Sequence, residues 1–452
     1  MARAKKEAAL TPEERLQAAL VPDWEWPYKL PENWCWTTVG AINQYVGISA
    51  DPTKAKNKTF ELYSVPSSAD NYPEIVLGAD IGSTKQSVKK GDVLLCKINP
   101  RINRVWKVSK YTDHSLLASS EWIVIRNSGL ISNYLMWCFR SPYFRGYMLS
   151  NVSGVGGSLM RAQPKFVQGY PVPVPPLAEQ QRIVDRIESL FAKLDEAKEK
   201  AQAVVDSFET RKAAILHKAF TGELTAKWRE EHGVGMESWE KFKFNELGTL
   251  ERGRSKHRPR NDPKLFGGKY PFIQTGDVAR SGMYITEHTQ TLSELGAEQS
   301  KLFPKGTLCI TIAANIGDVS ILTYDCCFPD SVVGFTPNER TLSEYIYYLM
   351  STLQREIEAN APATAQKNIN LRILNDLLLD IPSVAEQIQI VNQVEYLFFQ
   401  EQHAKEAAEA VLEQIDLMKK SILARAFRGE LGTNDPSEES AVELLKEIIR
   451  RG

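Results

Sequence analysis

Long apolar runs are missing from this sequence of 452 residues. No stretch approaches the roughly 18 unbroken apolar residues that a membrane helix needs. The first segment, residues 1–10, is basic but lacks the apolar core of a signal peptide. These two absences exclude a membrane-spanning protein and predict a cytoplasmic one with no membrane partner.

Cysteine is scarce, with six residues in the chain. None of them forms a Cys-x-x-Cys pair, and none has a histidine at the spacing of a zinc ligand. The sequence therefore predicts no metal site, and buried thiols in a reducing compartment are favoured over disulfides. The six positions are Cys35, Cys96, Cys138, Cys309, Cys326 and Cys327.

Net charge is nearly absent, at −1 for the whole chain, but the charges are unevenly distributed. The segment 34–170 carries sixteen Lys and Arg against eight Asp and Glu, a net charge of +8. The segment 239–376 has sixteen residues of each sign. It nevertheless contains a dense basic run between Arg252 and Arg260. A local basic face supplies the attraction for phosphate that binding of DNA requires, although such a run also suits a solvated loop.

Signatures of catalysis are also missing. An adenine methyltransferase needs Asn or Asp followed by Pro-Pro and an aromatic residue, and Asn99-Pro100-Arg101 is the nearest run. Gly267-Gly268-Lys269 lacks the spacing of a phosphate-binding loop. Pro329-Asp330 is not followed by the Glu-x-Lys of a nuclease, and no histidine stands at triad spacing. The sequence predicts a non-catalytic chain; a self-contained DNA-modifying enzyme with an unrecognised site stays open.

An internal repeat organises the chain. Pro-Leu-Ala-Glu-Gln at 176–180 recurs as Ser-Val-Ala-Glu-Gln at 383–387. With the same offset, Ala-Phe-Thr-Gly-Glu-Leu at 219–224 recurs as Ala-Phe-Arg-Gly-Glu-Leu at 426–431. No gap is needed between these two matches, so each copy is one continuous element.

Each copy is predicted to be one long helix. Prolines (Pro176 and Pro382) precede the two starts and glycines (Gly222 and Gly429) follow the two ends, as helix punctuation requires. A helix of about 43 residues is roughly 65 Å long. Apolar residues recur at steps of three and four, which predicts an antiparallel coiled-coil pair with small residues mid-seam and Glu401 as an interruption. The predicted seam residues are Ile183, Ile187, Leu190, Leu194, Ile390, Val394, Leu397, Val411 and Ile415.

The two blocks that these helices separate are rich in short β-branched and aromatic runs broken by turn residues. They share a faint skeleton. Trp34-x-Trp36 is matched to Phe242-x-Phe244, and Lys90-Gly91 is matched to Lys305-Gly306. A helix start at Ser132 is matched to one at Ser343. The chain is therefore one duplicated module in which the surfaces of the blocks have diverged.

Such a module has an approximate two-fold axis, as duplex DNA has. Two readers held a fixed distance apart, commonly one helical turn or roughly 34 Å, can read two half-sites on one face of DNA. Because the blocks differ, the target would be bipartite and asymmetric, with an unread gap. The alternative is a non-DNA protein-interaction scaffold built on a duplicated coiled coil, against which the charge of +8 argues.

Three runs carry a resemblance to a known family: Pro-Pro-Leu-Ala-Glu-Gln-Gln-Arg-Ile-Val at 175–184, Ala-Phe-Thr-Gly-Glu-Leu-Thr-Ala-Lys-Trp at 219–228 and Ala-Arg-Ala-Phe-Arg-Gly-Glu-Leu at 424–431. Together with the order of segments, they resemble the specificity subunits of type I restriction–modification systems. The resemblance implies an α+β fold, with two mixed α/β target-recognition domains bridged by two long antiparallel helices. The implied function is to read a bipartite DNA target, without catalysis.

The resemblance also implies partners. They are double-stranded DNA, two methyltransferase subunits docked on the helices, and restriction or translocase subunits. Those subunits use S-adenosylmethionine, ATP and magnesium, so this chain needs no cofactor of its own. The implied segments are an N-terminal extension at 1–30, recognition domains at 31–175 and 238–382, helical spacers at 176–237 and 383–431, and a C-terminal tail at 432–452 that contains a short amphipathic helix.

Residues that pair hydrogen-bond donors with acceptors are the candidates for reading DNA, with Arg or Lys toward guanine and Asn or Gln toward adenine. They gather in a loop after Cys96, in two segments that precede the long helices and resemble a DNA-approaching loop of the family, and in the basic run of the second block. Each could instead be a turn residue that caps the backbone. The candidates are Lys97, Asn99, Arg101, Asn103, Arg104, Ser158, Arg161, Gln163, Arg252, Arg254, Lys256, Arg258, Arg260, Asn315, Gln366, Lys367 and Asn368.

Overall fold

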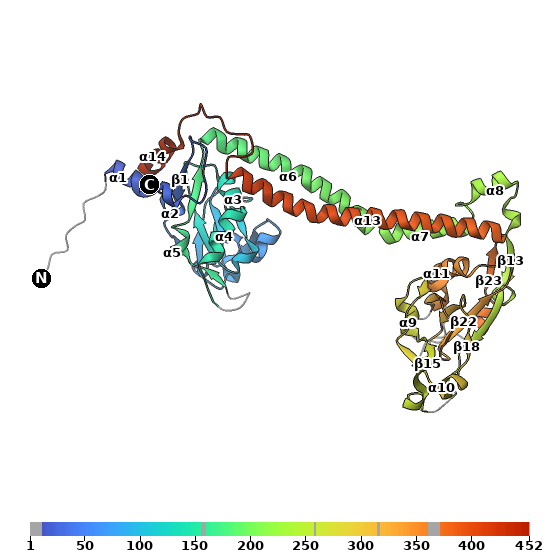
Figure 1. Cartoon of the computed structure of the whole chain (residues 1–452). Coiled ribbons are helices and arrows are strands. Elements are labelled where there is room, and N and C mark those ends of the chain that lie inside the picture. Colours follow the sequence, from blue (N-terminus) through green and yellow to red (C-terminus); the bar gives the residue numbers. More distant parts are fainter. Residues whose placement is uncertain (1–10, 155–159, 257–258, 314–316, 360–370, 452) are drawn as a thin grey trace. The chain divides into compact units, whose positions relative to one another are not determined.

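The computed structural model describes residues 11–154, 160–256, 259–313, 317–359 and 371–451 (Figure 1). The chain divides into two compact units. Unit 1 comprises Met1–Ala201 and Ala410–Gly452, and unit 2 comprises Gln202–Glu409. Each unit therefore contains one block of strands together with part of each long helix. Across the described ranges, no helix combines the length and the apolar character that a membrane crossing requires.

Unit 1 contains a five-stranded sheet of order β2-β5-β8-β3-β4, a three-stranded sheet of order β7-β6-β9, and the pairs β1-β12 and β10-β11. The strands are β1 Cys35–Thr38, β2 Ser49–Ala50, β3 Thr59–Tyr63, β4 Glu74–Leu77, β5 Lys85–Ser87, β6 Val93–Cys96, β7 Val105–Lys107, β8 Ser115–Ala118, β9 Trp122–Ile125, β10 Val152–Ser153, β11 Arg161–Ala162 and β12 Pro171–Val174. The helices of this block are α1 Pro12–Ala19, α2 Val39–Ile42, α3 Ser132–Arg140, α4 Pro142–Ser150 and α5 Pro164–Val167.

Strand β6 is the middle strand of the three-stranded sheet and is buried on both faces. Leu94 and Cys96 point into a core shared with the five-stranded sheet, which also buries Trp122. Val93 and Leu95 point into the opposite core, which contains α3, β1 and the start of the first long helix. Because alternate side chains of a strand face opposite sides, a fully apolar strand is expected where both faces are covered.

Unit 2 contains a five-stranded sheet of order β14-β22-β19-β20-β16, a four-stranded sheet of order β17-β15-β21-β18, and the pair β13-β23. The strands are β13 Glu240–Lys243, β14 Gly248–Arg252, β15 Phe266–Phe272, β16 Tyr284–Ile285, β17 Gln290–Leu292, β18 Leu302–Phe303, β19 Leu308–Thr311, β20 Val319–Leu322, β21 Cys326–Cys327, β22 Val332–Pro337 and β23 Leu378–Ile381. The helices are α8 Ala226–His232, α9 Thr275–Arg280, α10 Glu294–Glu298, α11 Ser343–Ala359 and α12 Leu371–Asn375.

The predicted duplication is visible in the two sheet regions. Gly91 and Gly306 both have left-handed backbone angles, with φ of 93° and 86°, and each lies two residues before the first residue of the matching strands β6 and β19. Such angles carry little cost only for glycine, which explains why it recurs at both positions. The predicted helix starts at Ser132 and Ser343 are confirmed as the first residues of α3 and α11.

One matched pair of the skeleton was wrong. Cys35 lies opposite Val174 at the end of β12, and Glu240 lies opposite Ile381 at the end of β23. Those registers place Trp34 in the position of Trp239 and not in that of Phe242. The predicted alignment of the two block starts is therefore wrong by three residues. It relied on the spacing of aromatic residues, whereas strand pairing sets the true correspondence.

The long helices are α6 Leu177–Asp206, α7 Phe208–Phe220 and α13 Val384–Ala426. The second copy is one continuous helix as predicted, whereas the first is interrupted at Ser207. The Ser207 hydroxyl donates to the carbonyl of Ala203, and the side chain of Arg211 donates to Val204 O at 3.1 Å. A serine bonded back to the preceding turn competes with the helical backbone and bends helices, which accounts for the break.

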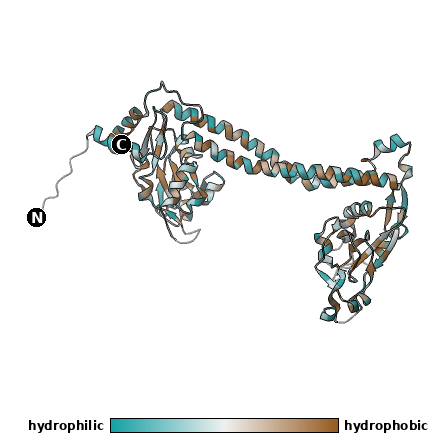
Figure 2. Cartoon of the chain, viewed as in Figure 1, coloured by the Kyte–Doolittle hydropathy of each residue, from teal (hydrophilic) through white to brown (hydrophobic). Residues whose placement is uncertain are grey.

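The helices pack in antiparallel fashion, as expected. In unit 1, Lys419 of α13 pairs with Asp195 of α6; in unit 2, Arg211 of α7 pairs with Glu401 of α13 at 2.6 Å. Residue numbers thus rise along one helix while they fall along the other. Hydrophobic residues, brown in Figure 2, are frequent in the strands, while hydrophilic residues recur along both long helices.

Five of the predicted seam residues are buried, namely Ile183, Ile187, Ile390, Val394 and Ile415. Three more, Leu190, Leu194 and Leu397, are half-buried. The prediction for Val411 was wrong, because its side chain is 44% exposed while the adjacent Leu412 is half-buried. The seam passes through Ala408, Leu412 and Ile415, a step of four and then three.

Two lysines of α13 lie over aromatic rings of the opposite helix. Lys405 Nζ lies 4.7 Å from the centre of the Phe208 ring, and Lys419 Nζ lies 5.1 Å from that of Phe191. Contacts of this kind stabilise a partly buried ammonium group. Glu401, expected to interrupt the seam, is instead part of it through its ion pair with Arg211.

The tail contains the helix α14 Ala441–Arg451, so the predicted short amphipathic helix is present. Leu445 and Ile448 of α14 are buried in the same core as Leu16 and Ala19 of α1. The two described ends of the chain therefore pack together on unit 1 (Figure 1).

Candidate nucleic-acid interface

The loop between β6 and β7 carries the first predicted group of DNA contacts: Lys97, Asn99, Arg101, Asn103 and Arg104. A short 3-10 helix, Pro100–Ile102, lies between Asn99 and Asn103, which have left-handed φ values of 46° and 53°. Asparagine tolerates this conformation better than most residues. The resulting sharp turns leave Arg101 and Ile102 exposed at the tip of the loop.

The two asparagines of this loop have different surroundings. Asn103 Nδ2 donates to the carbonyl of Arg140 at 3.1 Å, so this amide holds the loop to the end of α3. Asn99 Oδ1 is buried and accepts no hydrogen bond from the described residues. Leaving a buried acceptor unpaired is costly, so Asn99 is the better placed of the two to accept a bond from a ligand.

The hairpin β10–β11 brings Arg161 and Gln163 beside this loop. Ile98 forms a bridge with Arg161, and Asn99 N donates to Met160 O at 2.8 Å. Two segments that are separate in sequence therefore meet on one side of unit 1. The Arg161 guanidinium is paired with Glu121 at 2.8 Å and is half exposed, so it stands at the surface in a fixed position.

A buried carboxylate orders another loop of unit 1. Glu61 accepts hydrogen bonds from the backbone of Tyr111 and from the backbone and hydroxyl of Thr112. Burial raises the pKa of Glu61, but the bonds from Tyr111, Tyr63 and Thr112 together outweigh burial and lower this pKa below its ordinary value. The loop so held presents the exposed ring of Tyr111 against that of Tyr72, with 4.8 Å between ring centres.

The basic run of unit 2 begins at the end of β14. Arg252 donates to the backbone carbonyl of Asp330, and Arg260 pairs with the carboxylate of Asp330 at 2.6 Å. One aspartate therefore fixes both ends of the run. Arg254 and Lys256 lie between them and are exposed.

Arg254, Lys256 and Arg260 line a pocket of about 470 Å³. Four other residues that line the pocket carry side-chain amides and were not among the predicted contacts. They are Asn261, Gln274, Gln290 and Gln299. They come from β17 and from loops that are far apart in the sequence, so no local pattern could identify them.

The remaining predicted contacts, Ser158, Arg258, Asn315, Gln366, Lys367 and Asn368, lie outside the described residues.

The repeated Ala-Glu-Gln run has a structural role that is the same in both units. Gln180 accepts from Ile131 N at 2.9 Å and donates to Pro175 O at 3.0 Å. Gln387 accepts from Leu342 N at 3.0 Å and donates to Pro382 O at 2.9 Å. Each buried amide thus joins the start of a long helix to the segment before α3 or α11.

The glutamate of the same run joins the start of one long helix to the end of the other. Glu386 accepts from the hydroxyl of Thr225, after α7, and pairs with Arg229 at 2.6 Å. Glu179 accepts from the hydroxyl of Thr433, after α13, and pairs with Arg182 at 2.7 Å. In both cases the partner threonine follows the repeated Gly-Glu-Leu motif, whose glycines, Gly222 and Gly429, have a left-handed backbone that ends the helix.

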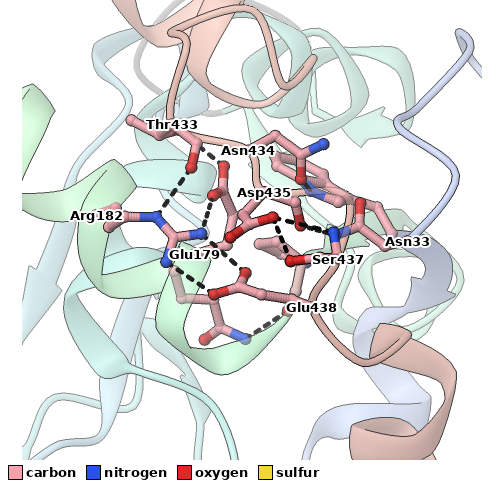
Figure 3. Close-up of polar contacts among 11 residues, drawn as sticks. Asn33, Glu179, Arg182, Thr433, Asn434, Asp435, Ser437 and Glu438 are labelled. Carbon is pink, nitrogen blue, oxygen red and sulfur yellow. Dashed lines mark hydrogen bonds and ion pairs between the residues drawn. The ribbon is translucent and has the colours of Figure 1, made fainter.

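The Glu179 cluster also holds the tail (Figure 3). Arg182 donates to Thr433 O at 2.9 Å and to both oxygens of Glu438. Asn33 donates to Asp435 O at 2.9 Å. The bonds from Arg182 to Glu438 and Glu179 raise the pKa of the Arg182 guanidinium, so this cation stays charged.

The described residues contain no group of three or more His, Cys, Asp and Glu side chains arranged to hold a metal ion. All six cysteines are free and buried, as predicted. Burial raises the pKa of Cys35 to about 12, so this thiol is protonated at neutral pH. The charged and amide-bearing loops of the two units are surfaces suited to a ligand.

Comparison with known proteins identifies this architecture. The family model described as the type I restriction modification DNA specificity domain matches residues 47–205 and 236–411, one copy in each half of the chain. The chain therefore belongs to this family. It is a DNA specificity subunit with two target-recognition domains, a class of subunit that is non-catalytic, and it is part of a type I restriction–modification complex.

Individual relatives agree. The chain is 27% identical to the EcoKI specificity subunit of Escherichia coli strain K12 over 351 residues, which cover 72% of this chain and 73% of that protein. It is 24% identical to the Escherichia coli EcoBI specificity subunit over 345 residues, 68% of this chain and 69% of the relative. The crystal structure of the HsdS subunit from Thermoanaerobacter tengcongensis has the same fold, with a TM-score of 0.67 and 22% identity over 90% of this chain and 100% of that chain.

Proposed function

We propose that this chain reads a bipartite, asymmetric DNA target, with one half-site for each recognition domain. The domains span 31–175 and 238–382 in this proposal, and the helical segments 176–237 and 383–431 are spacers that hold them. The segments 1–30 and 432–452 are the N-terminal extension and the tail. The observation that carries the proposal is the contrast between corresponding anchors, Gln180 and Gln387, and unlike exposed loops.

The first domain offers guanidinium and amide groups on the loop 97–104 and at Arg161, within a block of net charge +8. The second offers a basic run beside an amide-lined pocket. Arg and Lys anchor phosphates and recognise guanine, while amides recognise adenine. The two surfaces therefore suit different half-sites.

The spacer helices are proposed to dock two methyltransferase subunits, and restriction subunits join through them. Exposed apolar side chains on α13, such as Tyr396, Phe399 and Leu417, are available for such contacts. S-adenosylmethionine, ATP and magnesium would be used by those partners. Adenine methylation needs the base to leave the stack and enter a methyltransferase pocket. This chain supplies the sequence specificity. The complex works in the cytoplasm, where the free thiols of this chain stay reduced.

The test is to map methylated adenine across the genome of host cells with and without this gene, with the methyltransferase present. Loss of one gapped, bipartite motif on deletion is the expected result. Replacement of residues 238–382 by those of a relative should change one half of the motif and leave the other. An unchanged methylation pattern with an active methyltransferase would contradict the proposal and favour a scaffold that does not bind DNA.

A further inference from the structure

The pocket of unit 2 combines an apolar floor with a polar rim. Leu265, Phe272 and Leu292 form the floor and are buried, and Phe266 lies beside them. The rim carries three cations and four amides, named above. A concave site of several hundred Å³ with an apolar base and few convergent polar groups is the usual form of a specific ligand site.

Two of the amides are joined to each other. Gln274 Nε2 donates to Gln290 Oε1 at 2.6 Å. Within the described residues, this bond leaves the acceptor Gln274 Oε1 and the donor Gln290 Nε2 for a ligand. An acceptor beside a donor matches the edge of adenine, which presents the N6 amino donor and the N7 acceptor in the major groove.

A buried aspartate fixes the position of both amides. Asp277 is 5% exposed and accepts from Gln274 N at 2.8 Å and from the hydroxyl of Thr289 at 3.2 Å. These two donors belong to Gln274 itself and to the neighbour of Gln290, and Arg280 also pairs with Asp277 at 2.8 Å. The pairing of β15 with β17 places Gln290 opposite Phe272, two residues from Gln274. The amide pair is therefore held before any ligand arrives, which lowers the entropic cost of binding.

The glycine pair Gly267-Gly268 allows this arrangement. Gly267 has a φ of 83°, and a Cβ on Gly268 would lie 2.5 Å from Leu292 O. The register of β15 against β17 shifts between Phe266 and Tyr270, so the glycines form a bulge. Bulges of this kind redirect side chains next to functional sites. Gly267 and Gly268, which lack the spacing of a phosphate-binding loop, thus position their neighbour Phe266 and the facing Leu292, which line the pocket.

We propose that this pocket reads an adenine in the half-site of the second recognition domain, through Gln274 and Gln290. Arg254, Lys256 and Arg260 hold the neighbouring phosphates, and the apolar floor contacts the base or an adjoining thymine methyl group. The inference rests on the proposed function, because it names the base and the residues by which that domain recognises DNA.

The test uses the chain assembled with its methyltransferase subunits. Gln290→Met keeps the length of the side chain and removes the amide. Binding of the wild-type motif and of duplexes substituted at each A·T pair of the second half-site is measured by fluorescence anisotropy. Wild type should discriminate at one A·T pair by tenfold or more, as a good bidentate contact does. Gln290→Met should lose that discrimination and keep the discrimination within the first half-site.

A second variant keeps the test decisive if Gln290→Met assembles poorly. Gln290→Glu offers only acceptors, so it should lose adenine and favour cytosine, whose N4 group is a donor. Lys256→Ala should weaken binding of all duplexes alike, whereas the matched control Lys264→Ala, an exposed lysine not lining the pocket, should bind as wild type does.

Two outcomes separate the inference from the function on which it rests. If wild type discriminates in both half-sites and both Gln290 variants keep the full wild-type discrimination, or weaken all duplexes equally, the pocket does not read adenine and the inference is wrong. If the assembled wild-type complex shows no preference for any bipartite motif, the proposed function fails first.

Discussion

The two glutamates of the repeated Ala-Glu-Gln motif make the same connection in different surroundings. Glu386 is enclosed, and the side chain of its cation Arg229 is only 8% exposed. Glu179 is equally buried, but the side chain of its cation Arg182 is 38% exposed and is shared with Glu438 of the tail. In unit 2 the connection is made by the covalent linker between α7 and β13, and in unit 1 it is made by the tail. The comparison teaches that the tail substitutes for a linker.

The largest expected difference between the units is in the free energy of unfolding that Arg229→Met and Arg182→Met each remove. Removing Arg229 takes the cation from the buried carboxyl group of Glu386 and leaves it the bonds from Thr225 and Trp239, which should cost about 3–5 kcal/mol. Removing Arg182 exposes its site to water and leaves Thr433 on Glu179, so the expected loss is about 1 kcal/mol or less. Urea unfolding of the two variants, followed by circular dichroism, measures both. Equal losses would show that the greater solvent exposure of Arg182 does not weaken its pair with Glu179.

The helix pair offers a comparison between two neighbouring residues of α13. Ile415 is 2% exposed, and Ile415→Ala should lower the free energy of unfolding by about 2–4 kcal/mol. Val411→Ala should change it by less than about 0.5 kcal/mol, because Val411 is 44% exposed and lies outside the seam. Thermal melting of both variants tests the position of the seam. A larger loss for Val411→Ala than for Ile415→Ala would mean that Val411 lies in the seam, as sequence periodicity predicted.

Periodicity and repetition predicted the larger features of the fold, namely two sheet regions, two long antiparallel helices and their start and end signals. Those features depend on patterns repeated over many residues or on single residues with strong backbone preferences, such as Gly91 and Gly306. The break at Ser207 was missed because serine is common in helices and only its bond to Ala203 O reveals the bend. The phase error at Trp34 arose because strand pairing, and not aromatic spacing, sets the register.

The candidate site was predictable in part. Lys97 to Arg104 form a loop beside Arg161, as their polar and turn-forming composition indicated. The amides Gln274 and Gln290 were not found, because their meeting depends on the pairing of β15 with β17 and on a bulge, and Gln299 reaches the pocket from the end of α10. Side chains that converge from separate strands leave no spacing in the sequence by which to recognise them.

The two buried glutamines should prove unequal. Gln180→Met and Gln387→Met each leave a backbone N–H without its acceptor, at Ile131 and Leu342, which costs about 1–3 kcal/mol apiece. Gln387 also accepts from the hydroxyl of Thr341 at 3.1 Å and donates to Arg340 O at 2.9 Å, so its loss should be the larger by about 1 kcal/mol. Guanidinium unfolding of each variant gives the values. Equal losses would mean that these two additional bonds contribute nothing to the anchor in unit 2.

A buried carboxylate orders one loop in each unit, Glu61 in unit 1 and Asp277 in unit 2. The smallest expected effect is the contribution of Glu61 to the pH dependence of stability. The pKa of Glu61 lies below its ordinary value of 4.5 in the folded chain. Its ionised form therefore stabilises unit 1 fully above pH 4.5, and this contribution is lost as the pH falls through the lowered folded pKa. Glu61→Gln should be less stable than wild type at pH 7, and the difference should shrink as the pH is lowered below 4.5. The control Asp113→Asn changes a fully exposed carboxylate and should leave the pH dependence as it is. The measurement is the urea midpoint of the three proteins between pH 7 and pH 3. A stability difference between wild type and Glu61→Gln that stays constant over this range would contradict the prediction. It would show that hydrogen bonds hold the Tyr111 loop irrespective of the charge on residue 61.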